Sequence, residues 1–231
     1  MKNDVIETKI IDMNYQGGGI ARHNNLIIFI DNTTIGDLVE AVIIKEKKNY
    51  AIAKLTKIIE PSNIRENPIC TSYQACGGCQ IQHIKYDYQG NIKEKIVKDD
   101  LERIGKVIPK EIYPIITMES PFYYRNKAQY PIRKINGEVQ IGFFATKSHR
   151  LVNIKECVIQ DKKNTQIIEI VRTFLQDYNI SIYDEETHRG LVRHLVIRTS
   201  HNFDETLVCL VINGDKLNYM DKLVEMLKNT V

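Results

Sequence analysis

The stretch that decides the fold of the N-terminal region is a succession of short apolar runs: LIIFI at residues 26–30, LVEAVII at residues 38–44 and YAIAKL at residues 50–55. β-Branched and other apolar side chains dominate these runs, and turn-forming Gly, Asn and Asp residues separate them. Short runs at this spacing are typical of a small antiparallel β-barrel. Another apolar run precedes them, and Pro61-Ser62-Asn63 follows as a boundary, so we expect a barrel domain over residues 1–59.

Beyond this region the chain alternates helical and strand patterns, which predicts a mixed α/β domain over residues 60–231. Apolar residues recur with helical spacing in three segments: 86–104 (stopped by Gly105), 161–178 and about 215–229. Asn136-Gly137 lies between alternating apolar residues and predicts a β-hairpin, and Pro131 favours an edge position for its first strand. Two further strands are expected, around 191–199 and 206–212.

Composition excludes several classes of protein. The chain has 231 residues, 43% hydrophobic and 26% charged, which is ordinary for a globular protein and excludes disordered and collagen-like chains. None of its apolar runs approaches the roughly 18 residues of a membrane helix, and no export signal is seen. We therefore expect a cytoplasmic protein without a membrane partner, and a monomer.

The charge is unevenly distributed. The formal net charge is only +3, but residues 121–158 carry seven basic and two acidic side chains, a local net of +5. An even +3 would be a weak argument for a polyanionic partner, whereas a concentrated surplus is a stronger one.

The five cysteines suggest chemistry other than disulfide formation, because their number is odd and no export signal precedes them. Cys70, Cys76 and Cys79 follow a C-x5-C-x2-C pattern, and Cys157 comes much later in the chain. Four thiolates suit tetrahedral zinc or an iron–sulfur cluster. Gly77-Gly78 favours the cluster, because glycine lets backbone N–H groups turn toward sulfur.

The cysteines also allow a redox interpretation. Cys76 and Cys79 could form a thioredoxin-like redox pair, although that motif opens a helix after a strand and here it lies in a loop. The remaining Cys209 lies in an apolar strand pattern, which predicts a core residue.

The basic stretch mixes cations with aromatic residues, a combination that binds phosphates and stacks unpaired bases. An ordinary solvated sheet face with core aromatics on its other side explains the composition equally well. A second candidate is the pair Arg193-His194, which interrupts an apolar strand pattern, although His194 is equally well explained as a buried histidine. The RNA-contact candidates are Arg125, Asn126, Lys127, Arg133, Lys147, His149, Arg150, Arg193 and His194.

Taken in order, these motifs resemble the RNA uridine-5-methyltransferase family (TrmA/RumA-like, including 23S rRNA uracil-5-methyltransferases). The segments that carry the resemblance are Cys70-x5-Cys76-Gly77-Gly78-Cys79-Gln80-x-Gln82-His83, then Tyr124-Arg125-Asn126-Lys127, Ile141-Gly142-Phe143-Phe144, Cys157 and 191–198. The resemblance implies a TRAM barrel (an OB-like, RNA-binding fold) at the N-terminus. It also implies a 4Fe–4S cluster on Cys70, Cys76, Cys79 and Cys157, and a ribosomal RNA partner.

The same resemblance implies methylation of uracil carbon 5 with S-adenosylmethionine as donor. In the family the donor site and the catalytic residues lie in a C-terminal Rossmann-like domain, and no cysteine here matches the family's nucleophile. We therefore expect an N-terminal part of such an enzyme, with an incomplete central domain and no catalytic residue, that binds RNA but does not methylate by itself. A stand-alone RNA-binding module with a structural zinc on the same four cysteines is the alternative.

Overall fold

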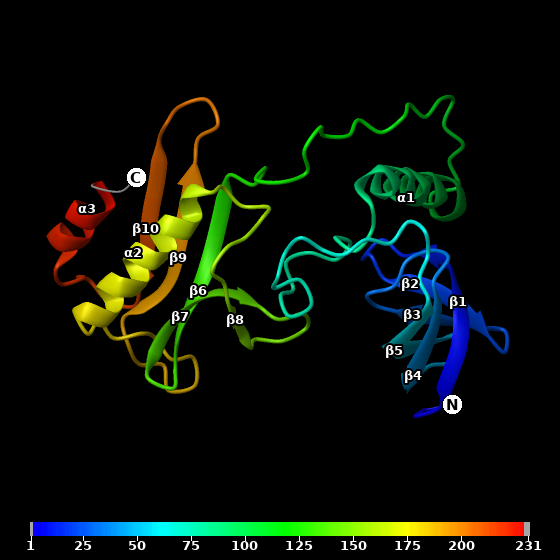
Figure 1. The fold of residues 1–231 in the computed structure, drawn as a ribbon, viewed down its shortest axis with the longest axis horizontal. Helices are drawn as coiled ribbons and strands as arrows, with labels where there is room; N and C mark the ends of the chain where they lie inside the picture. The colour runs from blue at the N-terminus through cyan, green and yellow to red at the C-terminus, as the bar shows by residue number, and fades with distance from the viewer. Residues whose placement is uncertain (1, 229–231) are drawn as a thin grey trace. The chain divides into compact units, whose positions relative to one another are not determined.

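The computed structural model describes residues 2–228 and contains two sheets (Figure 1). The first five strands form a closed barrel in the order β1-β2-β3-β5-β4. Their bounds are β1 Val5–Met13, β2 Gly19–His23, β3 Leu26–Ile30, β4 Leu38–Glu46 and β5 Tyr50–Glu60. The predicted barrel is therefore confirmed. It contains one strand, β2, that was not predicted, because it begins in the glycine-rich sequence Gly17-Gly18-Gly19.

One strand pair departs from the prediction of an antiparallel barrel. β3 pairs with β5 in parallel, from Ile27 opposite Tyr50 to Ile30 opposite Ala53, while the other described pairs are antiparallel. The cause is closure: β4 lies between β3 and β5 in the sequence but at the other side of β5 in the barrel. The interior of the barrel is filled by alternate residues of its strands. These are the small or β-branched side chains Ile6, Ile10, Ala21, Ile28, Ile30, Val39, Ala41, Ile43, Ala51 and Ala53.

By its contacts the chain divides into two compact units. The first comprises residues 1–69 and 79–119, and the second comprises residues 70–78 and 120–231. Residues on both sides of position 60 belong to the first unit. The predicted domain boundary near residue 60 stays a prediction.

A helix follows the barrel in the first unit. The predicted helix over 86–104 is an α-helix only from Tyr86 to Asp99 (α1), after which Asp100–Ile104 (η1) form a π-helical turn. Gly105 caps the end of the helical segment, as predicted, with a right-handed φ of −70°, and the positive φ follows at Lys106. The predicted apolar stripe is also only partly buried, with Ile92 inside and Ile104 78% exposed.

The second unit is built on an antiparallel sheet in the order β10-β9-β6-β7-β8. The bounds are β6 Lys127–Ile135, β7 Glu138–Phe144, β8 Leu151–Asn153, β9 Val192–Thr199 and β10 Thr206–Ile212. α2 (Lys163–Asp177) packs on one face with Ile167, Val171 and Phe174, and α3 (Met220–Lys228) contributes Leu223 to the same core. The predicted hairpin, second helix and two C-terminal strands are confirmed, while the last helix begins later than expected and residue 229 lies outside the described residues.

Pro131 is not in an edge strand, which corrects the prediction. β6 is the central strand of the sheet, pairing with β9 over residues 127–131 and with β7 over residues 132–135. Pro131, which has no N–H to donate, is the last residue paired with β9, where β6 changes partners. The hairpin itself follows expectation, with Asn136 at φ 52° and Gly137 at φ 88°, as a type I′ turn requires.

None of the helices among residues 2–228 combines the length and the apolar character that crossing a bilayer requires.

Candidate functional site

Three of the four predicted ligand cysteines lie in the second unit. Cys70 and Cys76 are in the loop over residues 70–78, and Cys157 follows β8. The backbone of Cys76 forms an isolated antiparallel β-bridge with that of Ala145, and the Gly77 N–H donates to the Phe144 carbonyl oxygen at 2.9 Å. A Cβ at Gly77 would lie 3.1 Å from that oxygen, so a larger residue would need the backbone at the end of β7 to shift by a few tenths of an ångström.

The sulfur atoms are half-buried and receive backbone hydrogen bonds. Burial raises the pKa of the Cys76 thiol, an effect that the Gly78 N–H, 3.4 Å from its Sγ, partly offsets. Burial likewise raises the pKa of Cys157 against hydrogen bonds from the backbone of Ile159 and Gln160. Electrostatic repulsion from Cys70 adds to both increases, and repulsion from Cys76 adds to that of Cys157.

This environment fits a thiolate-bound metal centre. Mutually repelling thiolates need a compensating cation, and N–H groups directed at sulfur are a common feature of iron–sulfur sites. Cys79 belongs to the first unit, where the Gln82 side-chain amide lies 3.3 Å from its Sγ. Among residues 2–228, no three His, Cys, Asp or Glu side chains are grouped closely enough to hold a metal ion. The structure thus describes the surroundings of the sulfurs and not an assembled centre.

Cys209 is not a core residue, which corrects the prediction. It is exposed, because its strand β10 lies at the sheet edge and alternate residues of that strand face solvent. The apolar run around it therefore indicated a strand but not a fully buried one.

Several predicted RNA contacts are brought together around one carboxylate. Glu185 pairs with Arg133 at 3.4 Å and with Arg193 at 3.3 Å. The Arg193 guanidinium also lies over the Tyr183 ring, 4.4 Å from its centre. Burial, together with the charges of Arg193 and Arg133, lowers the pKa of His194. At neutral pH His194 is therefore uncharged and offers hydrogen bonds rather than positive charge.

Phe144 connects this group to the loop after β7. The Arg133 guanidinium lies 5.8 Å from the Phe144 ring centre, and the His149 ring packs edge-on against the same ring at 5.4 Å. Lys147 and Arg150 are exposed in that loop, where Lys147 adopts a positive φ of 54°. The structure therefore links His149 of this loop to Arg133 through the Phe144 ring.

The remaining candidates lie at the opposite end of β6. Arg125 and Asn126 precede the strand, which Lys127 begins, and the Arg125 guanidinium lies 6.0 Å from the Tyr124 ring centre. Lys127 and Arg133 are six positions apart, about 20 Å along a strand, so the predicted contacts form two groups instead of one patch.

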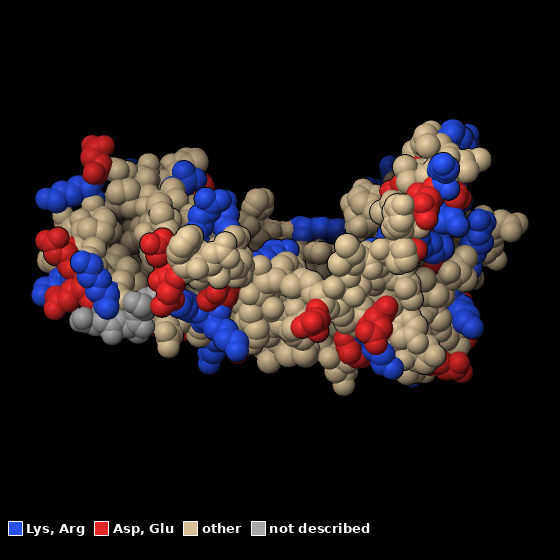
Figure 2. All heavy atoms as spheres, turned by 90° about the horizontal axis from the view of Figure 1, so that it is seen from above, with Lys and Arg blue, Asp and Glu red and all other residues tan. Residues whose placement is uncertain are grey.

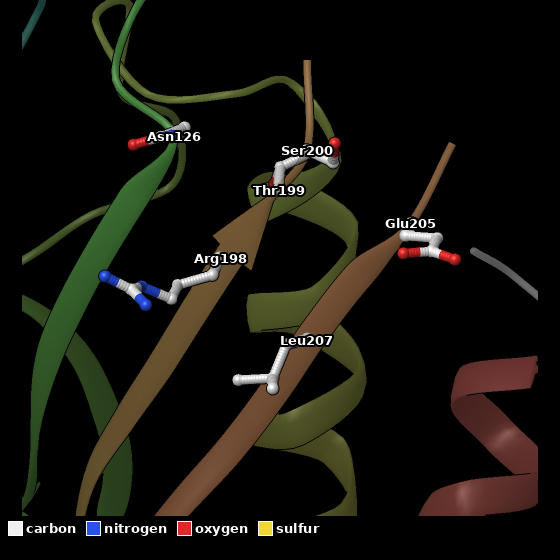
Figure 3. Close-up of a pocket in the computed structure, with 6 residues that line it drawn as sticks. All are labelled: Asn126, Arg198, Thr199, Ser200, Glu205 and Leu207. Carbon is white, nitrogen blue, oxygen red and sulfur yellow. The ribbon is translucent and has the colours of Figure 1, made fainter. Parts of the chain in front are cut away.

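Three functional candidates escaped the sequence analysis: Glu185, Arg198 and Glu205. Arg198 is the Cα partner of Lys127, and with Glu205 it lines a hollow at the end of the sheet (Figure 3). Strand register brings Arg198 to Lys127, and loop geometry brings Glu185 to the arginines. No local sequence signal encodes either arrangement.

Comparison with known proteins first defines the class of the N-terminal barrel. Residues 1–56 match the family described as TRAM domain. The five-stranded barrel is thus a TRAM domain, as the resemblance implied.

The relatives of the whole chain are RNA methyltransferases. One from Clostridium tetani is 42% identical over 226 residues, which cover 98% of this chain and 49% of that protein. One from Halalkalibacterium halodurans is 38% identical and covers 100% of this chain and 50% of that protein. The chain is therefore a homologue of bacterial RNA methyltransferases, and it spans about half the length of the curated relatives it matches.

A solved structure shares the fold. The Pyrococcus abyssi tRNA (uracil-54, C5)-methyltransferase in complex with S-adenosyl-L-homocysteine superposes with a TM-score of 0.68 at 24% identity. The match covers 94% of this chain and 48% of that one. The barrel followed by the mixed α/β unit is thus an arrangement known from a methyltransferase structure.

Proposed function

We propose that residues 1–231 provide the RNA recognition of an S-adenosylmethionine-dependent RNA uracil-C5-methyltransferase that acts on ribosomal RNA of the 23S class. The observation that carries the proposal is the match of nearly the whole chain to RNA methyltransferases, with a TRAM domain at residues 1–56. The uracil target is supported by the motif resemblance and by the tRNA uracil substrate named for the Pyrococcus abyssi structure.

The second unit supports the proposal with two cationic groups. Arg133 and Arg193 each place a guanidinium beside an aromatic ring. Single-stranded RNA is bound by such pairs, because the guanidinium binds its phosphates and the ring stacks on its bases. Arg125 and Lys127 supply a second contact region at the other end of β6. RNA that contacts both groups would lie along this strand.

Binding to fragments of 23S rRNA, to tRNA and to duplex DNA of equal length tests the proposal. We expect the rRNA fragments to bind most tightly, and Arg133→Met to weaken that binding about tenfold, whereas Lys134→Met at the hairpin end serves as the matched control with little effect. Preference for tRNA would overturn the ribosomal assignment, and equal binding to duplex DNA would overturn specific RNA recognition.

S-adenosylmethionine would supply the methyl group, and we assign its site to no residue among 2–228. None of the five cysteines, all of which lie among residues 2–228, is in a disulfide. This suits a reducing compartment, so we place the protein in the cytoplasm and take it to act as a monomer.

We also propose that Cys70, Cys76, Cys79 and Cys157 hold a 4Fe–4S cluster. Support comes from the repulsion among the three thiols of the second unit, from the N–H groups directed at Cys76 and Cys157, and from the position of Cys79 three residues after Cys76. The cluster would neutralise the thiolates and tie the loop over residues 70–79 to the segment after β8.

Metal analysis of anaerobically purified protein tests the cluster. We expect about four iron atoms per chain. Cys70→Ser should abolish iron binding, and the exposed Cys209→Ser should retain it. One zinc ion per chain and no iron would instead support a structural zinc site, and iron retained by Cys70→Ser would contradict the ligand assignment.

A further inference from the structure

Two like charges face each other on neighbouring strands of the second sheet. Lys127 of β6 and Arg198 of β9 are Cα partners, and both are exposed. Their neighbours Ala128 and Ile197 alternate into the core beneath α2, so the two cations project from the opposite face. Neither makes an ion pair with any residue among 2–228. Like charges directly opposite each other destabilise a sheet, and an anion bound between them would remove that cost.

The row continues across a third strand with an apolar residue. Leu207 of β10 is the Cα partner of Arg198 on the other side, and its side chain is 57% exposed. Figure 3 shows Arg198 and Leu207 on the face of the sheet away from α2. Two strand spacings, about 10 Å, separate Lys127 from Leu207. The row therefore offers two cations and then an apolar platform.

A shallow hollow of about 380 Å³ is lined by Arg198 and Leu207 of this row, and Lys127, the Cα partner of Arg198, lies beside it. Its lining includes Asn126 and Ser200 at the strand ends and Glu205 at the start of β10. Glu205 makes no ion pair among the described residues, so its carboxylate remains available as an acceptor. A ligand that was only an anion would be repelled by Glu205, and a ligand that was only a cation would be repelled by Arg198 and Lys127.

We propose that this hollow is a subsite for one unpaired nucleotide of the bound RNA. Its phosphate lies between Lys127 and Arg198, its base packs on Leu207, and an exocyclic amino group of the base donates to Glu205. A carboxylate accepts well from the cytosine N4 amino group, whereas uracil has the acceptor O4 at the same position. The subsite therefore favours cytosine over uracil. This inference rests on the proposed RNA recognition and adds a base-reading position to it.

Affinities of the full chain for short oligocytidylate and oligouridylate RNAs, measured over a range of salt concentrations, test the subsite. We expect tighter binding of oligocytidylate. Lys127→Met and Arg198→Met should weaken the binding of both RNAs, and each should reduce the slope of log affinity against log salt by about 0.7, the contribution of one phosphate contact on a single strand. Glu205→Gln should remove the preference for cytosine without changing the slope. Lys134→Met, in the same strand but away from the hollow, is the matched control.

A stability measurement separates loss of the site from misfolding. Because each Met substitution relieves the repulsion between Lys127 and Arg198, both variants should melt at a temperature equal to or slightly above that of the unaltered chain. Unchanged RNA affinity in both variants, or equal binding of the two RNAs by the unaltered chain, would overturn the subsite while RNA recognition stands. If the unaltered chain bound no RNA at all, the proposed function itself would fail.

Discussion

At the residue scale, one buried carboxylate organises the junction between the barrel and the segment that follows it. Asp37 is fully buried and accepts hydrogen bonds from the Thr34 and Ser62 N–H groups and from Arg65, whose Nε lies 3.1 Å from Oδ1. Burial by itself would raise the pKa of Asp37, but these hydrogen bonds outweigh it and hold the pKa below its ordinary value. The carboxylate therefore stays ionised, and its pairing fixes Arg65 against the barrel.

Replacing Asp37 tests this junction. Asp37→Asn leaves Arg65 without its anion, and we expect the free energy of unfolding in urea to fall by about 3 kcal/mol. The exposed Glu60→Gln is the control and should change it by less than about 0.5 kcal/mol. A loss for Asp37→Asn no larger than for the control would show that the ion pair contributes nothing.

His83 makes the stability of the same region depend on pH. It is 2% exposed, and its Nε2 donates to the Thr33 carbonyl oxygen at 3.1 Å. Burial lowers the pKa of His83 below the ordinary 6.5, so the folded protein keeps it neutral where the unfolded chain takes up a proton. This contribution to stability is complete above pH 6.5 and is lost as the pH falls from 6.5 toward the folded-state pKa.

Urea denaturation at several pH values between 7 and 5 tests the contribution of His83. We expect His83→Gln to reduce the loss of stability on acidification, and the exposed His201→Gln to leave it as in the unaltered chain. An identical pH dependence in His83→Gln would refute the assignment.

At the element scale, much of the secondary structure could be predicted from sequence because its signals are local. Short apolar runs indicated β3, β4 and β5, and Asn136-Gly137 indicated the β6–β7 hairpin. The errors in the sheets concern strand pairing. The parallel β3–β5 pair and the central position of Pro131 depend on which strands lie next to each other, and local sequence patterns do not determine strand order. The site follows the same rule, since the cysteine motif is local whereas the pairing of Lys127 with Arg198 is not.

Gly137 and Gly142 both lie in the β6–β7 hairpin, but each requires glycine for a different reason. A Cβ on Gly142 would lie 1.9 Å from the Val152 carbonyl oxygen, so Gly142→Ala must displace β8 from β7. A Cβ on Gly137 would meet nothing within 4 Å, and only its φ of 88° opposes Ala. We expect Gly142→Ala to cost more than about 2 kcal/mol and Gly137→Ala about 1 kcal/mol in urea denaturation. The reverse order would contradict the close β7–β8 pairing.

At the scale of the whole molecule, charge distribution matters more than net charge. Figure 2 shows Lys and Arg interspersed with Asp and Glu on the visible face, in keeping with a net charge of only +3. The surplus positive charge of residues 121–158 is divided between the two ends of β6. At one end Glu185 pairs with arginines. The other end lies next to the hollow that Glu205 lines. Such discrete contacts suit selective binding better than a uniform basic field does.

The salt dependence of RNA affinity tests the central claim most directly. Each phosphate contact made by a cation contributes about −0.7 to the slope of log affinity against log salt for a single strand. With contacts at both ends of β6, we predict a linear decrease with a slope steeper than about −2 for a 23S rRNA fragment. Combined replacement of Lys127, Arg133 and Arg198 by Met should make that slope clearly shallower. Affinity that does not change with salt, or a slope unaltered in the triple variant, would contradict RNA recognition by this sheet.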